Sequence, residues 1–131
     1  MYIVQRYLDR PYLIGGKKFD LRVYALVMSY MPLVVYLFRS GFARFTHHRY
    51  STNTEDIGNT FIHLTNVAVQ KHSQAYTGQA KWGANNVRKF LTARHGVEKA
   101  NAAFLGIQGE TPVFSLSFSF SSFTDASAVV L

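Results

Sequence analysis

The sequence predicts an α+β fold, an antiparallel β-meander followed by helices, on three observations. Apolar and polar residues alternate along residues 18–30, which is the period of a half-buried strand. Turn signals recur at short intervals up to residue 41, as in strands joined by hairpins. From residue 82 onward the apolar residues follow helical spacing instead. The length of 131 residues favours one small domain and excludes a large multidomain protein.

The first part of the chain predicts the strands of the meander. Residues 2–7 are rich in β-branched and aromatic side chains and predict a strand that ends at a turn over residues 9–11. Ile14–Lys17 contains two glycines and predicts a hairpin-type turn. Three further strands are predicted, separated by turns at residues 31–32 and 40–41: Lys18–Tyr30, Leu33–Phe38 and Phe42–Phe45.

The second part predicts loops and helices. A polar loop over Thr46–Thr60 leads to a short apolar strand over Phe61–Asn66, and residues 76–79 form another loop. A helix is predicted from residues that recur at helical spacing, namely Trp82, Val87, Phe90, Leu91 and Arg94. Gly96 predicts its end, and Val97–Leu105 predicts a second, weaker helix.

A change of composition divides the chain into residues 1–107 and a tail, residues 108–131. The tail alternates Phe or Leu with Ser and contains two acidic residues but no basic one, so it is a low-complexity segment unrelated to what precedes it. The whole chain has a formal net charge of +7, which fits an acidic partner. It has no Cys, which excludes disulfide scaffolds, zinc-thiolate sites and cysteine nucleophiles.

No segment predicts a membrane span or a signal peptide. The most apolar stretch, Val23–Phe38, is interrupted by Ser29 and Pro32, and it is shorter than the roughly 20 apolar residues that a spanning helix needs. The N-terminal residues lack a charged region followed by an apolar one. We therefore expect no membrane partner and a cytosolic protein.

Lys18, Asp20 and Arg22 form the most informative cluster. Residues two apart on a strand share one face, so these three side chains project together. Lysine as a point charge and arginine as a two-pronged donor suit phosphate groups. The alternative is an exposed strand face with a cross-strand ion pair, which is common and weak.

Arg44 is a lone cation in the apolar strand Phe42–Phe45. It could hold a carboxylate through a bidentate pair. The alternative is an edge-strand cation that discourages aggregation.

Thr65 and Asn66 end the predicted strand that contains His63. Their side chains could contact ribose, phosphate or a metal-bound water, and the alternative is turn or helix-cap chemistry. Five histidines are present, but no pair has metalloprotease spacing, and His47 and His48 would point to opposite faces of a strand. No protein metal ligands are therefore expected. Rossmann, P-loop and hydrolase-elbow motifs are absent from the sequence.

Several ordered segments together resemble the tubulin tyrosine ligase-like family, whose members are ATP-grasp enzymes that add amino acids to tubulin. The segments are Val4–Leu8, Pro11, Leu13–Gly16, Lys18–Arg22, Gly41–Phe45 and His63–Asn66. The polyglutamylase branch, especially its members linked to cilia and basal bodies, is the part of the family with the most similar sequences. The segments that carry this similarity are LIGGKKFDLRVY, HLTNVAVQKH and the later Lys81-Trp82. The resemblance covers about residues 1–107 and implies that they are the central part of an ATP-grasp domain.

The resemblance implies a role for each matching residue. Residues 5–8 (Gln5, Arg6, Tyr7 and Leu8) match the strand and hinge that hold the adenine. Lys18 and Asp20 match contacts to phosphate and ribose, and Thr65 and Asn66 match further ATP contacts. Arg22 matches a catalytic residue near the γ-phosphate. The cations that match the site of the incoming amino acid are Arg44, Lys71 and Lys81.

The implied chemistry is ATP-dependent amide formation with Mg²⁺. A glutamate side chain in the tubulin C-terminal tail becomes an acylphosphate, which the amine of free glutamate attacks; fixed cations stabilise the transferring phosphoryl group. The implied partners are tubulin tails, or microtubules, and free glutamate. The implied location is the cytoplasm and cytoskeleton, at a cilium or basal body. No nucleic-acid partner is expected, because no RNP-like signature is present.

The sequence departs from the family in two ways. It starts at the adenine hinge, and residues 107–131 contain no Asp followed by Glu-x-Asn, the motif that holds Mg²⁺ in the family. We therefore expect a truncated chain that is inactive alone. Two other functions stay open: a non-catalytic basic module that binds acidic tails, and a ligase for another amino acid such as glycine.

Overall fold

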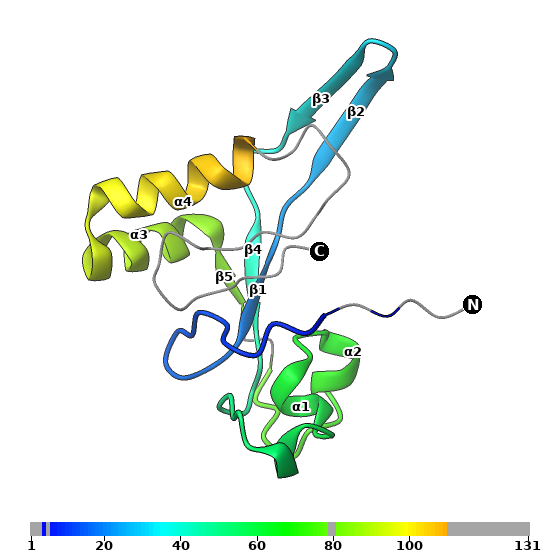
Figure 1. Cartoon of the computed structure of the whole chain (residues 1–131), viewed down its shortest axis with the longest axis vertical. Helices are drawn as coiled ribbons and strands as arrows, with labels where there is room; N and C mark the ends of the chain where they lie inside the picture. The colour runs from blue at the N-terminus through cyan, green and yellow to red at the C-terminus, as the bar shows by residue number, and fades with distance from the viewer. Residues whose placement is uncertain (1–3, 5, 79–80, 110–131) are drawn as a thin grey trace.

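The computed structural model describes residues 4, 6–78 and 81–109 (Figure 1). Antiparallel strands come first and helices follow, so the predicted α+β class is confirmed. Over these residues, no helix has the length and apolar character needed to cross a membrane.

A three-stranded antiparallel sheet forms the centre of the molecule. It consists of β1 (Phe19–Arg22), β4 (Phe42–Phe45) and β5 (Lys81–Gly83), in the order β1-β4-β5. Trp82, which the helical spacing had included in a helix, lies in β5 instead. A strand of three residues is too short to show alternation in the sequence.

A separate two-stranded hairpin projects from one end of this sheet (Figure 1). It consists of β2 (Ala25–Tyr30) and β3 (Leu33–Leu37), which pair only with each other. The predicted strand over residues 18–30 is thus divided at residues 23–24. The strands are antiparallel as expected, but the hairpin is inserted between β1 and β4 rather than forming consecutive strands of one meander.

The junction of hairpin and sheet requires Gly41. A Cβ atom at this position would lie 2.4 Å from the carbonyl oxygen of Arg22, so a side chain would force the backbone apart. Arg22 pairs directly with Phe42 in the register of β1 and β4. The chain therefore leaves the sheet and returns to it at neighbouring positions.

The predicted turn at Ile14–Lys17 is confirmed. Ile14 and Lys17 exchange two backbone hydrogen bonds of 3.2 and 3.1 Å, and Gly15 and Gly16 have φ of 61° and 73°. Positive φ at both central positions is the geometry of a type I′ hairpin turn, which glycine adopts at no steric cost. Of the strand predicted over residues 2–7, Val4, Arg6 and Tyr7 are not in a strand, and the other positions lie outside the described residues.

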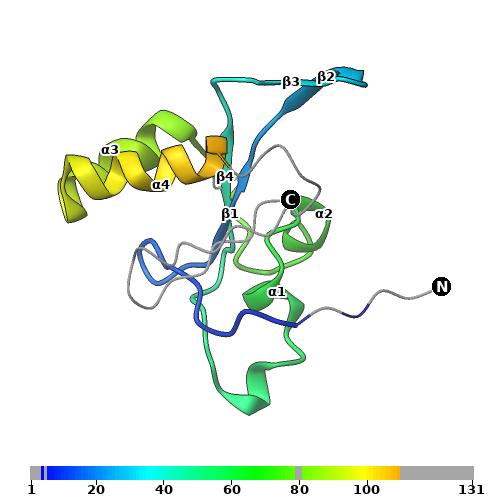
Figure 2. The ribbon, with the colours of Figure 1, turned by 45° about the horizontal axis from the view of Figure 1, so that its top comes forward.

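Two helices cover one face of the three-stranded sheet (Figures 1 and 2). These are α3 (Ala84–His95) and α4 (Val97–Gly109), which confirm the two predicted helices, and Gly96 ends α3 with a φ of 90°. The core between sheet and helices is made of Phe19, Leu21, Ala43, Phe45, Val87, Leu91, Ala100, Ala103 and Ile107, with Ile14 beside them. Helix α4 continues to Gly109, and the predicted boundary after residue 107 stays a prediction because residues 110–131 are outside the described residues.

The segment between β4 and β5 contains a loop and two short helices. The predicted loop contains one 3₁₀ turn, Thr54–Asp56, and is followed by α1 (Thr60–His63) and α2 (Val67–Gln70). The predicted strand over residues 61–66 is therefore wrong. Asn59 and Asn66 explain the error, because their side chains cap the two helices by accepting hydrogen bonds from Phe61 N and Ala68 N.

Candidate functional site

The face of the sheet opposite α3 and α4 carries the predicted site residues. Asp20, Arg44 and Lys81 lie in one row across β1, β4 and β5, because Asp20 pairs with Arg44 and Arg44 with Lys81. Lys18 and Arg22 flank Asp20 at spacings of two and share its face. We call this surface the polar face. Residues from three strands thus lie on one face of the sheet. The alternation in the sequence predicted this shared face for the residues in and beside β1.

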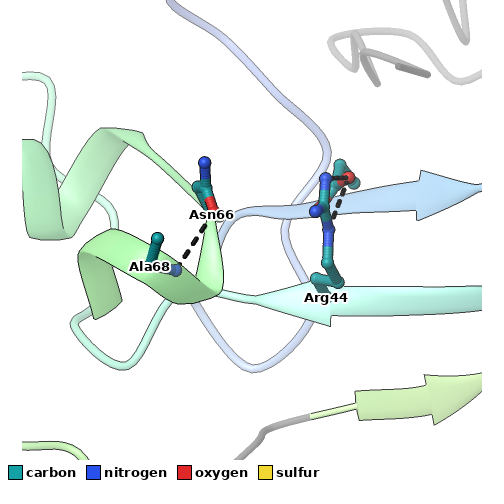
Figure 3. Close-up of polar contacts among 4 residues, drawn as sticks. Arg44, Asn66 and Ala68 are labelled. Atoms are coloured by element: carbon teal, nitrogen blue, oxygen red, sulfur yellow. Dashed lines mark hydrogen bonds and ion pairs between the residues drawn. The ribbon is translucent and has the colours of Figure 1, made fainter. Parts of the chain in front are cut away.

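An ion pair between Asp20 and Arg44 is at the centre of the polar face (Figure 3). Nε of Arg44 donates to both carboxylate oxygens at 3.0 Å, and Nη2 donates to Oδ2. The side chains are 7% and 18% exposed, respectively. The hydrogen bond from Asp20 raises the pKa of Arg44, and burial opposes it with a smaller effect. The guanidinium is therefore a fixed cation.

Both alternative interpretations of these residues are corrected by this pair. Arg44 is not an edge-strand cation, because β4 is the middle strand. The cross-strand ion pair is present, but it is mostly buried rather than exposed. Asp20 occupies only the Nε–Nη2 edge of the guanidinium; within the described residues, Nη1 makes no hydrogen bond. The end of the guanidinium can therefore accept a second anion.

Lys18 precedes β1 and is held by neutral groups. Its Nζ donates to the hydroxyl of Tyr7 at 3.2 Å and to the carbonyl oxygen of His63 at 3.0 Å. It also lies 4.7 Å from the centre of the Tyr7 ring. No carboxylate of the described residues is within ion-pair distance of this ammonium. Burial lowers the pKa of Lys18, and the charge of Asp20 opposes this with a smaller effect.

Tyr7 and His63 form a connection that the sequence did not predict. The two residues are 56 positions apart, and the Tyr7 hydroxyl lies 2.8 Å from Nδ1 of His63. Tyr50 adds to the cluster, because its hydroxyl lies 3.4 Å from that of Tyr7 and its ring centre 5.6 Å from that of His63. The Tyr50 hydroxyl also donates to the carbonyl of Asp9 at 2.7 Å. Resemblance had assigned Tyr7 only to a hinge, and no local pattern in one sequence indicates a contact over such a separation.

Thr65 and Asn66 lie at the start of α2. The Asn66 side chain accepts a hydrogen bond of 3.1 Å from Ala68 N, so the predicted alternative of a helix cap is confirmed for this residue (Figure 3). Thr65 lines a narrow cleft together with Arg44 and Lys81. The cleft brings three predicted site residues from α2's start, β4 and β5 to one place.

The remaining predicted residues make no hydrogen bond or ion pair with Asp20 or Arg44 in the described part of the chain. Arg22 is exposed, with its guanidinium carbon 5.8 Å from the centre of the Tyr24 ring, and it lines a cavity of about 550 Å³ at the base of the hairpin. Lys71 is exposed at the end of α2, with no side-chain contact to the other site residues among the described contacts. Lys81 is exposed and lies over the Phe42 ring at 4.9 Å. Arg6 is exposed and Leu8 half-buried, whereas Gln5 lies outside the described residues.

Gln70 is a buried polar residue that sequence reasoning missed. Its side chain is almost fully buried and accepts a hydrogen bond from His47 N at 2.9 Å. Its Nε2 donates to the carbonyls of Phe61 and Leu64 at 2.9 and 2.5 Å. Gln70 thus ties α1 and α2 to the end of β4, which places Thr65 beside Arg44. Glutamine is mostly exposed in proteins, so its presence at the end of the segment Val67–Gln70 gives no sequence signal of burial.

Metal-ligating side chains do not gather on the polar face. Over the described residues, no group of three His, Asp or Glu side chains could hold a metal ion. Asp20, the one carboxylate of the row, is paired with Arg44. No magnesium ligand set is therefore assigned among the described residues.

Comparison with known proteins places these residues in one family. The sequence model of the tubulin-tyrosine ligase family matches residues 1–103. The chain is 49% identical over 105 residues to a probable alpha-tubulin polyglutamylase, Ttll1, of Tetrahymena thermophila. The aligned stretch covers 79% of this chain and 25% of that protein. It is 50% identical over 105 residues to a probable tubulin polyglutamylase, TTLL9, of Bos taurus, covering 79% and 22%.

A more distant relative is a tubulin monoglutamylase, TTLL4, of Homo sapiens. It is 43% identical over 100 residues, covering 70% of this chain and 8% of that protein. The chain spans about a quarter, or less, of the length of the curated relatives that it matches.

Proposed function

Because this chain belongs to the tubulin-tyrosine ligase family, we propose that it forms one wall of the site of an ATP-dependent ligase that adds glutamate to tubulin. The names of its relatives, tubulin polyglutamylases and a monoglutamylase, support glutamate over glycine as the amino acid. A microtubule substrate further implies the cytoplasm and cytoskeleton, at a cilium or basal body, as the place of action.

The observation that carries this proposal is the polar face. It holds a half-buried lysine with neutral partners next to an arginine that is fixed by a carboxylate. A cation without a neutralising carboxylate attracts an anionic ligand such as the phosphates of ATP. Lys18 therefore fits the nucleotide, with Asp20, Arg22, Thr65 and Asn66 as the further contacts that the family resemblance implies.

Arg44 fits the carboxylate of the incoming glutamate. Its Nε–Nη2 edge is used by Asp20, and its other edge is left for a second carboxylate. Lys81 lies opposite Arg44 in the register of β4 and β5 and lines the same cleft. Two cations at one cleft would attract a carboxylate ligand, and Lys71 at the end of α2 is the third cation in this assignment.

The proposed reaction has two steps. A side-chain carboxylate oxygen of a tubulin glutamate attacks the γ-phosphorus of ATP, which forms an acylphosphate and releases ADP. The amine nitrogen of free glutamate then attacks the acyl carbon, loses a proton and expels inorganic phosphate, which leaves an amide bond. The cations of the polar face would stabilise the charge on the transferring phosphoryl group. Mg²⁺ belongs to the proposal as a cofactor, but no step is assigned to it because the described residues do not form its ligand set.

Nucleotide binding tests the first half of the proposal. We expect the 131-residue chain to bind ATP in a calorimetric titration, and Lys18→Ala to weaken binding by about tenfold or more, as for loss of a charged hydrogen bond. Lys89→Ala, an exposed lysine on α3, is the matched control and should bind as the parent does. Equal affinities of the parent and Lys18→Ala would contradict the assignment of Lys18.

A chimera tests the second half. Residues 4–103 would replace the aligned stretch of the bovine relative, and the product would be assayed for ATP-dependent incorporation of labelled glutamate or labelled glycine into tubulin. We expect incorporation of glutamate, with a strong loss in Arg44→Lys, which keeps the charge but not the two-pronged edge. Lys99→Ala, an exposed site on α4, should retain activity. A folded chimera that transfers neither amino acid would refute the ligase proposal. The expectation that the 131 residues are inactive alone stays a prediction that the same assay tests.

A further inference from the structure

We propose that Tyr7 and His63 are positioning residues that fix the Lys18 ammonium on the polar face for an anionic ligand. This inference rests on the proposed function, because it takes the ligand to be the phosphate groups of a nucleotide. It goes beyond it in assigning a role to the Tyr7 hydroxyl and to both the ring and the carbonyl of His63.

The hydrogen-bond directions form a single chain. Nε2 of His63 lies 3.0 Å from the carbonyl oxygen of Asp56 and can only donate to it. Nδ1 of His63, at 2.8 Å, is then the nearer acceptor for the Tyr7 hydroxyl proton; the Tyr50 oxygen, whose own proton goes to Asp9, lies 3.4 Å away. The Tyr7 oxygen in turn accepts from Lys18 at 3.2 Å. The ring of His63 therefore determines which way the tyrosine oxygen offers its lone pairs to the ammonium.

The chain of bonds leaves one donor of the ammonium available. An ammonium has three N–H donors, and two of them go to Tyr7 and to the carbonyl of His63. The third has no partner among the described residues. Since both partners are neutral, they orient the ammonium without cancelling its charge. Arg44 differs in this respect, because one edge of its guanidinium is already paired with the carboxylate of Asp20.

The three residues also come from distant parts of the chain. Tyr7 lies in the segment before the first strand, Lys18 directly before β1 and His63 in α1. The Tyr7 ring meets the His63 ring edge-on, with centres 5.6 Å apart, so packing adds to the hydrogen bond. Two sequence segments thus converge on one ammonium, which is the arrangement expected of a fixed anion contact rather than of a surface lysine.

Tyr7→Phe is the decisive variant, because it keeps the ring beneath the ammonium and removes only the hydroxyl. We expect it to weaken ATP binding by about fivefold to tenfold, the effect of one hydrogen bond to a charged group. Binding of adenosine, which has no phosphate, should stay unchanged. Tyr36→Phe on β3, an exposed tyrosine 62% accessible, is the matched control and should bind both ligands as the parent does.

A second variant and a double variant separate positioning from folding. His63→Asn removes the ring but keeps the backbone carbonyl, and should show the same selective loss for ATP. In a Lys18→Met background, Tyr7→Phe should cause no further loss, because the residue acts through Lys18. The inference is overturned if Tyr7→Phe binds ATP normally, if ATP and adenosine weaken equally, or if the two substitutions add. If the parent chain itself does not bind ATP, the proposed nucleotide role fails and the inference falls with it.

Discussion

The two faces of the β1-β4-β5 sheet are held by different forces. On one face, Phe19, Leu21, Ala43 and Phe45 are almost fully buried against α3 and α4. On the polar face, Asp20 is equally buried, yet its neighbours are Arg44 and, two residues away, Lys18. Burial of apolar surface stabilises the first face directly, whereas the second must first offset the cost of removing charges from water. The buried charges of the polar face therefore stabilise the fold less than the apolar core on the other face does.

Leu91→Ala probes the apolar face and should have the largest effect. Leu91 is 1% exposed in the core, so the lost contacts and the cavity should lower the free energy of unfolding by about 2–5 kcal/mol. Thermal and denaturant unfolding of the chain would measure the change. Leu105→Ala, at a position 63% exposed on α4, is the control and should change stability little. A loss at Leu91 no larger than at Leu105 would mean that α3 does not cover the sheet as described.

Asp20→Ala probes the centre of the polar face. It leaves the Arg44 guanidinium mostly buried without a counter-charge, and should cost about 2–4 kcal/mol in unfolding free energy. In a double-mutant cycle, the variant with both Asp20→Ala and Arg44→Ala should lose much less unfolding free energy than the sum of the two single losses. Glu55→Ala, an exposed carboxylate, is the matched control. Additive losses would show that the two residues do not interact in solution.

Gln70→Ala tests the support of the polar face by α1 and α2. It removes the partner of His47 N and of the Phe61 and Leu64 carbonyls, and should lower stability by about 1–3 kcal/mol. Gln74→Ala, an exposed glutamine four residues later, should be nearly neutral. Denaturant-induced unfolding gives both free energies, and equal losses would contradict the buried, hydrogen-bonded position of Gln70.

Lys18→Met should change the free energy of unfolding least of the four substitutions, and the size of this change should depend on pH. Burial holds the pKa of Lys18 below its ordinary value, so the unfolded chain binds the proton more tightly than the folded one. The stability of the parent should therefore rise, relative to Lys18→Met, as the pH increases toward the ordinary lysine pKa of about 10.4. Lys89→Met, at an exposed lysine, should show no such trend. A trend of opposite sign would mean that an anion, rather than neutral groups, surrounds Lys18.

Local signals were enough to predict most of the elements. The two glycines of Ile14–Lys17, the turns that bound the apolar strands β3 and β4, and the helical spacing of α3 each report on a few neighbouring residues. The same signals failed for α1, where asparagine caps outweighed an apolar run, and for β5, which is too short for a period. They also could not show that the alternation of residues 18–30 belongs to two sheets.

In the candidate site, too, local spacing predicted some features and could not predict others. Spacing alone placed Lys18, Asp20 and Arg22 on one face, and the structure agrees with that shared face for β1. The partners of these residues were not predictable, because Asp20 meets Arg44 at a separation of 24 and Lys18 meets His63 at 45. Pairs of that kind depend on the register of the sheet and on the docking of α1, which no single segment encodes.

The close approach of Gly41 to Arg22 makes the β2-β3 hairpin an independent module. The chain departs after Arg22 and returns at Phe42, and these two residues are already paired neighbours. The length and composition of the excursion between them can therefore vary without moving Asp20 or Arg44 by one position. In engineering terms, this junction is a graft point where a loop of another origin could be spliced in. In evolutionary terms, an insertion or deletion within this excursion would leave the register of the charged row across the sheet unchanged.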